Sequence, residues 1–70
     1  MTLKRYFDIT TDCWRFFRAY YGTPNTSDRW PEIIARAEAI QDKYDKCFYV
    51  IQLISFFVWQ LEVIAMEGTK

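Results

Sequence analysis

The fold is decided by residues 30–65, which read WPEIIARAEAIQDKYDKCFYVIQLISFFVWQLEVIA. Apolar side chains recur there in alternating steps of three and four: Trp30, Ile33, Ala37, Ile40, Tyr44, Cys47, Ile51, Ile54, Val58, Leu61 and Ala65. This alternation is the heptad rhythm of helices that pack side by side, as in coiled coils. No Gly, Pro or Asn follows Pro31 within the stretch. The pattern therefore favours one continuous helix over residues 29–67.

A bend near residues 42–46 is the alternative. These residues read Asp-Lys-Tyr-Asp-Lys and contain no strong helix breaker. Asp42 and Lys46 also have the spacing of an i,i+4 ion pair on a helix surface. A continuous helix over the whole stretch is nevertheless long for a globular protein, so a hinge at this point stays open.

Residues 3–21 form a second amphipathic pattern, with apolar side chains on one half of a helix and charged ones on the other. Thr2 is a suitable N-cap, and Gly22 suits the left-handed residue that follows a helix. Residues 22–28 have the composition of a loop, and Ser27 or Asp28 is expected to cap the next helix. The sequence thus predicts a single all-α domain over residues 1–70. It is a helical hairpin with a long second helix that assembles into a helical bundle, or else a three-helix bundle.

Composition excludes several classes of function. The 70 residues have a formal net charge of zero and no His, and their glycines are Gly22 and Gly68 alone. The chain therefore lacks the basic surface of a typical nucleic-acid binder, the commonest general base and metal ligand, and a glycine-rich phosphate loop. The acidic pairs on one helix face, Asp8 with Asp12 and Glu38 with Asp42, have cations nearby and are typical of a solvated surface. We expect no enzymatic activity, no cofactor and no metal.

The two cysteines, Cys13 and Cys47, stand among apolar neighbours in a chain without a signal-peptide pattern. Such thiols are typical of reduced, intracellular proteins, where they act as small core residues. We therefore expect a cytoplasmic protein whose cysteines do not pair with each other.

The second half of the long stretch is apolar nearly all round, which indicates a helix that is buried on most sides. A first helix of residues 3–21 is too short to cover all of residues 30–65, so a homodimer or larger symmetric oligomer is expected. Six residues are predicted to bind the partner: Phe48, Ile51, Phe56, Phe57, Trp59 and Leu61. The favoured function is a small non-catalytic protein–protein interaction module that self-associates.

Two other functions are weighed. Residues 47–66 have the length of a membrane span, but two Gln, one Ser and Glu62 interrupt them, which makes a membrane anchor the less favoured reading. Arg15 and Arg18 beside Tyr20 and Tyr21 combine basic and aromatic groups, as binders of single-stranded nucleic acid do. That cluster is small and diluted by acidic residues, so no nucleic-acid partner is expected.

Several short pieces support a resemblance: Cys13-Trp14 with Phe16-Phe17, Asp28-Arg29-Trp30, Ile33, Ile40 and Lys43-Tyr44. With these the chain resembles short, uncharacterised helical proteins of prophages and mobile elements of Gram-positive bacteria. The resemblance implies a small cytoplasmic accessory protein that acts by contact on a host or defence protein. It assigns no functional residues.

Overall fold

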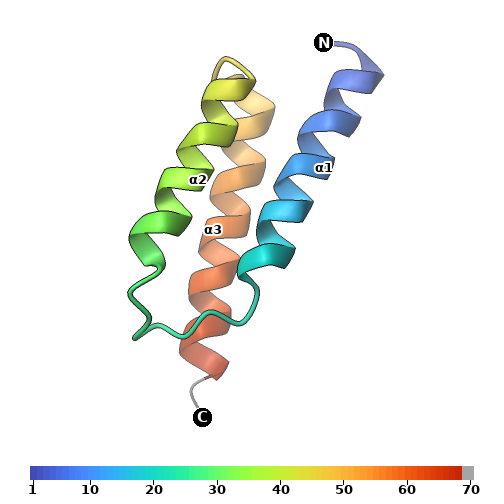
Figure 1. Cartoon of the computed structure of the whole chain (residues 1–70). Coiled ribbons are helices and arrows are strands. Elements are labelled where there is room, and N and C mark those ends of the chain that lie inside the picture. Colours follow the sequence, from blue (N-terminus) through green and yellow to red (C-terminus); the bar gives the residue numbers. More distant parts are fainter. Residues whose placement is uncertain (69–70) are drawn as a thin grey trace.

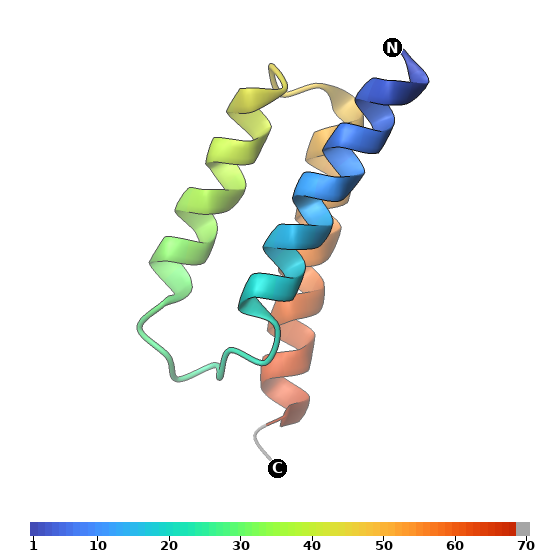
Figure 2. The ribbon, with the colours of Figure 1, turned by 45° about the vertical axis from the view of Figure 1, so that its right-hand side comes forward.

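The computed structural model describes residues 1–68, which form three α-helices and, within that range, no strand. Helix α1 spans Leu3–Tyr20, α2 spans Trp30–Lys43 and α3 spans Phe48–Gly68. Each helix packs against the other two. Helices α1 and α3 run parallel, and α2 runs antiparallel to both (Figures 1 and 2). The prediction of an all-α fold is confirmed, in the form of a three-helix bundle.

The prediction of one continuous helix over residues 29–67 is wrong. Helix α2 ends at Lys43, and a turn over residues 44–47 folds α3 back along it. In this turn Asp45 and Lys46 have left-handed backbone angles, with φ of 58° and 52°. The amide of Lys46 donates to the carbonyl of Gln41 (2.7 Å) and that of Asp45 to the carbonyl of Asp42 (3.1 Å). This is a Schellman motif, which here ends a helix without the usual glycine.

Burial explains why the chain turns. A left-handed residue other than glycine costs roughly 1–2 kcal/mol. Folding α3 back removes Val50, Ile54 and Leu61 from water almost completely, and each such side chain contributes about 1.5–3 kcal/mol. The gain exceeds the cost of the turn. The heptad rhythm continues through it because both helices direct their apolar stripes to one common core.

The ends of α1 follow the sequence prediction closely. The side chain of Thr2 accepts a hydrogen bond from the amide of Arg5 (3.2 Å), so Thr2 is the N-cap. Gly22 has a φ of +83° just beyond the helix, which ends one residue earlier than predicted. In the loop, the hydroxyl of Thr23 donates to the carbonyl of Tyr20 (2.7 Å).

The predicted cap of the second helix is wrong in its position. The N-cap of α2 is Arg29, which makes no side-chain capping bond, and neither Ser27 nor Asp28 occupies that place. The hydroxyl of Ser27 instead accepts from the amide of Arg29 (3.1 Å) and stabilises the turn before the helix. Pro31 lies in the first turn, where its missing amide is not needed.

The core takes side chains from all three helices. Its fully buried residues are Ile9, Cys13, Ile33, Val50, Ile54 and Leu61. Cys13 and Cys47 are free, as predicted. Burial and the nearby charge of Asp12 raise the pKa of the Cys13 thiol to about 11. Cys13 is therefore a small apolar core residue at neutral pH.

Candidate interaction surface

Helix α1 meets its two neighbours through different chemistry. We call the contact between α1 and α2 the polar seam, formed by Arg5, Asp12, Tyr20, Glu32, Lys43 and Tyr44. We call the contact between α1 and α3 the aromatic seam, formed by Tyr6, Phe17, Tyr49 and Phe57. The two seams lie on either side of the buried stripe of α1.

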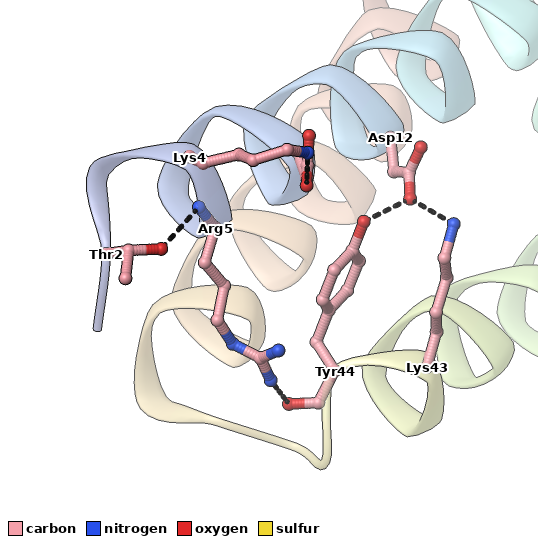
Figure 3. Close-up of polar contacts among 7 residues, drawn as sticks. Thr2, Lys4, Arg5, Asp12, Lys43 and Tyr44 are labelled. Atoms are coloured by element: carbon pink, nitrogen blue, oxygen red, sulfur yellow. Dashed lines mark hydrogen bonds and ion pairs between the residues drawn. The ribbon is translucent and has the colours of Figure 1, made fainter.

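Asp12 is the centre of the polar seam at its end near the 44–47 turn (Figure 3). One oxygen of its carboxylate accepts from the ammonium group of Lys43 (2.8 Å) and from the hydroxyl of Tyr44 (2.5 Å). The guanidinium of Arg5 donates to the backbone carbonyl of Tyr44 (3.0 Å). Helix α1 thereby holds the first residue of the turn through both its side chain and its backbone.

The electrostatics of this group favour an ionised Asp12. Burial opposes ionisation, but the hydrogen bonds from Lys43 and Tyr44 and the positive charges of Lys43 and Arg15 outweigh it. The pKa of Asp12 is held below its usual value. Burial and the hydrogen bond to Asp12 raise the pKa of Tyr44. At neutral pH the pair is therefore a carboxylate that accepts from a neutral phenol.

A second polar contact closes the seam at the loop end. The hydroxyl of Tyr20 donates to the carboxylate of Glu32 (2.6 Å), and the guanidinium of Arg29 lies 5.0 Å from the centre of the Tyr20 ring. Tyr20 is only 6% exposed. It is thus unavailable as a stacking platform for nucleic-acid bases, the role weighed for it from the sequence.

The aromatic seam is held by rings. Tyr6 meets Tyr49 edge to face with centroids 4.8 Å apart, and Phe17 stacks on Phe57 at 4.9 Å. The hydroxyls of Thr10 and Tyr49 share a hydrogen bond of 2.6 Å. These contacts join residues at matching heights of two parallel helices. The seam supplies packing area with one polar contact along its length.

Aromatic side chains continue outward from this seam into solvent. The exposed aromatic rings of residues 1–68 all belong to α1, to α3 or to Tyr21 directly after α1. We define the aromatic face as the six most exposed of these: Phe7, Trp14, Tyr21, Phe48, Phe56 and Trp59. Their exposed fractions run from 48% for Phe56 to 72% for Phe48.

Ring contacts connect the two halves of the aromatic face across the seam. Trp14 lies 5.9 Å from Phe17, which stacks on Phe57. Phe57 in turn lies 5.9 Å from Phe56, and Phe56 lies 6.4 Å from Trp59. An unbroken path of rings therefore runs from the outer side of α1 to the outer side of α3.

The structure divides the six residues predicted to bind a partner. Phe48, Phe56 and Trp59 are exposed and belong to the aromatic face, and Ile51 is exposed at 38% on the same helix. Phe57 is half-buried because it stacks on Phe17. Leu61 is in the core with 2% exposed, so the sequence-based assignment of a surface role to it is corrected.

Sequence reasoning missed the contribution of α1 to this surface. Phe7, Trp14 and Tyr21 follow one another at intervals of seven, which places them on one stripe of the helix. The amphipathic pattern of residues 3–21 places them in the same apolar half of the helix as the core residues. The signal was the width of that half, because one neighbouring helix covers only part of so wide an arc.

Helix α3 also has the dimensions of a membrane span. Phe48–Glu67 is long and apolar enough to cross a bilayer, and only about a fifth of its most apolar part is buried in the bundle. The core helix of a water-soluble protein is mostly buried. Most of the outer side of α3 is thus left uncovered by the rest of residues 1–68, and it combines exposed aromatic rings with the polar side chains of Gln52, Ser55 and Glu62.

The described part of the chain was also searched for metal-ligand groups. Residues 1–68 contain no group of three or more Cys, Asp or Glu side chains placed to hold a metal ion. Comparisons with protein-family models, curated proteins and solved structures found no match to this chain.

Proposed function

We propose that the protein is a small non-catalytic interaction module that pairs with a second copy of itself through the aromatic face. The observation that carries this proposal is the aromatic face itself. It has six exposed rings on α1, at Tyr21 and on α3, and four of them, Trp14, Tyr21, Phe56 and Trp59, are joined through the stacked pair Phe17 and Phe57. Water-soluble proteins rarely leave so much contiguous apolar surface uncovered.

The size of the aromatic face suits a stable interface. Multiplying the exposed fractions by about 200 Å² for an aromatic side chain gives on the order of 700 Å². The largest apolar patch on a typical monomer is roughly 300–600 Å², and a standard interface buries about 800 Å² on each partner. The summed exposed area of the six rings is thus close to what each partner of a dimer buries.

The charge distribution favours a second copy over a charged partner. The charged residues of α3 are Glu62 and Glu67, so most of its outer side has no ion to desolvate or pair. A two-fold axis brings the same patch of both copies together, which requires a surface that suits itself. The α3 part of the aromatic face, formed by Phe48, Phe56 and Trp59, meets that requirement without opposed like charges among its rings. Tyr and Trp are also the residues that most often dominate interface energetics.

The remaining sequence expectations join this proposal as hypotheses. The module acts in the cytoplasm, needs no cofactor and, following the resemblance to mobile-element proteins, serves as an accessory factor that contacts a host protein. The same aromatic face is the surface for such a target. Self-association then competes with target binding, and the dimer is the form that exists without the target.

Helix α3 favours a second candidate function, a membrane-anchored protein. The observation behind it is the low burial of the Phe48–Glu67 segment. Packing weighs against a spanning helix, since α1 lies parallel to α3 and carries Asp12, Arg15 and Arg18. Keeping the bundle would place these charges at bilayer depth, at a cost of about 2.5–3.5 kcal/mol each at the centre. The span requires α3 to leave the bundle.

Sedimentation equilibrium at micromolar concentration tests the dimer. The wild-type chain of 8.5 kDa should sediment at twice that mass, about 17 kDa. Trp59→Asp and Phe7→Asp each place a carboxylate within the interface, and each should weaken the dimer by at least about thirtyfold, as loss of a 2 kcal/mol hot spot does. Both side chains are largely exposed in the monomer, so the fold should survive.

Ala35→Asp is the matched control, because it adds the same charge to an exposed position of α2, away from the aromatic face. It should leave the dimer unchanged. A wild-type chain that sediments as a monomer contradicts the proposal. Flotation of that monomer with neutral lipid vesicles would favour the membrane candidate in its place.

A further inference from the structure

A cleft of about 290 Å³ lies between α1 and α2, on the side of α1 that faces away from α3. Its uncharged lining is formed by Phe16, Ala19, Tyr20, Ala39 and Ile40. Its rim holds three cations, Arg15, Arg36 and Lys43, and one anion, Asp12. Three positive charges less one negative leave a charge of +2 in a chain whose net charge is zero.

The two arginines are the uncommitted charges of this cleft. The carboxylate of Asp12 already accepts hydrogen bonds from Lys43 and Tyr44. The carboxylate of Glu32 nearby accepts from Tyr20 and forms an ion pair with Arg29. Arg15 acts on Asp12 and Arg36 on Glu32 through charge. Within residues 1–68, however, neither guanidinium makes a hydrogen bond or a close ion pair. Their donors therefore remain available to a ligand that enters the cleft.

We propose that this cleft binds a phosphate monoester with a small apolar body. Two guanidinium forks suit a phosphate group, which accepts several charge-assisted hydrogen bonds at once. A monoester carries close to two negative charges at neutral pH, which balances the charge of the cleft. Ala19 and Ala39 leave room for an apolar group between the helices, and the cleft volume limits that group to about one ring.

The cleft is separate from the proposed dimer interface. It lies between α1 and α2, whereas the aromatic face belongs to α1 and α3. Ligand binding is therefore expected in the monomer and the dimer alike. The Trp59→Asp variant, which breaks the dimer from α3 and lies outside the residues that line the cleft, should bind the ligand as the wild-type chain does, so the two proposals fail independently.

Phenyl phosphate is the probe, followed by ¹⁵N–¹H correlation spectra of the full chain at physiological ionic strength. The amides of Ala19 and Ala39 should shift and saturate. Phenol, which lacks the phosphate, should produce no shift, and inorganic phosphate, which lacks the ring, should bind more weakly. Arg15→Gln and Arg36→Gln should each weaken phenyl phosphate about tenfold, which corresponds to 1.4 kcal/mol.

Arg18→Gln is the matched control, since it removes an arginine of α1 that does not line the cleft. It should bind like the wild-type chain. Equal weakening by Arg18→Gln, or unchanged binding in the Arg15→Gln, Arg36→Gln double variant, overturns the proposal, as does the absence of saturable shifts. If a Gln variant loses its dispersed spectrum, Arg15→Lys and Arg36→Lys keep the charge, remove the fork and should still weaken binding.

A phosphotyrosine peptide distinguishes the two sources of this chemistry. Tighter binding of the peptide than of phenyl phosphate assigns the site to a phosphorylated side chain of a partner protein. Equal or weaker binding assigns it to a free small molecule. Either result upholds the phosphate monoester as the ligand class.

Discussion

Helix α1 contacts α2 through the polar seam and α3 through the aromatic seam. The first contact is made of specific hydrogen bonds and the second mainly of apolar packing. In the polar seam, Asp12 and Arg5 engage Tyr44 at the 44–47 turn, so direction and register are set by a few defined atoms. In the aromatic seam, Phe17 and Phe57 supply apolar area. The polar groups of the polar seam have hydrogen-bond partners within the chain, whereas the aromatic seam continues into aromatic rings that are exposed to solvent. One helix can thus position a fold on one side and present a binding surface on the other.

Loss of a ring should damage the bundle most. Phe17→Ala removes the side chain that stacks on Phe57 and leaves a gap in the aromatic seam. Phe17 is half-buried, so we expect unfolding free energy to fall by about 2–3 kcal/mol, less than the roughly 3–5 kcal/mol of a fully buried Phe. Urea unfolding followed by circular dichroism measures this.

The adjacent surface variant Arg18→Ala should change stability by less than about 0.5 kcal/mol. If Phe17→Ala were equally silent at the same protein concentration, the aromatic seam would not hold the bundle together.

Loss of the central carboxylate should cost less. Asp12→Asn keeps the shape of the side chain but weakens two hydrogen bonds, and should destabilise the protein by roughly 1–2 kcal/mol at neutral pH. Asp8→Asn is the matched control, because Asp8 forms an exposed ion pair with Lys4. Its effect should stay below about 0.5 kcal/mol.

The effect of Asp12 should disappear in acid. The pKa of Asp12 is lower in the folded chain than in the unfolded chain, where it is about 3.9. Its contribution is therefore complete above that pH and is lost as the pH falls through the folded pKa. The urea midpoints of the wild-type chain and Asp12→Asn should converge at about pH 2. If the two urea midpoints still differ at that pH, the effect of the substitution does not come from the ionisation of Asp12.

Two left-handed positions in different turns, Lys46 after α2 and Gly22 after α1, should give the smallest effects, with opposite signs. Lys46→Gly places glycine at a φ of 52° and should stabilise the protein by about 0.5–1 kcal/mol. Gly22→Ala should destabilise it by about 1 kcal/mol through backbone strain, since an added methyl group meets no atom within 4 Å. Thermal unfolding measures both effects. If the two substitutions changed the melting temperature in the same direction, one of these positions would not have left-handed geometry.

The sequence predicts those parts of the fold that local chemistry determines. Thr2 and Gly22 mark the ends of α1, and the loop composition of residues 22–28 separates it from α2. The turn at residues 44–47 was only the alternative to a continuous helix, because its motif uses Asp45 in place of glycine. Besides the burial of α3, a hydrogen bond to Asp12 holds this turn, and Asp12 lies 32 residues from Tyr44 along the chain. A contact of that range has no local signal.

The candidate surface divides in the same way. Phe48, Phe56 and Trp59 could be predicted because α3 is apolar nearly all round and some of its sides must face outward. Leu61 could not be told apart from them, since periodicity gives the angle between residues but not which side meets the core. Phe7 and Trp14 became recognisable only when the position of α3 showed which part of α1 it leaves uncovered.

The central claim is that the aromatic face is covered by a second copy of the chain, and intermolecular NOEs test it most directly. A sample that mixes ¹³C-labelled and unlabelled chains reports only contacts between copies. We predict such contacts between the rings of Phe7, Trp14, Phe56 or Trp59 of one copy and the same set of the other, with none from Ala35 on the outer side of α2. Contacts confined to α2, or no contacts between copies in a folded sample at millimolar concentration, would contradict the claim.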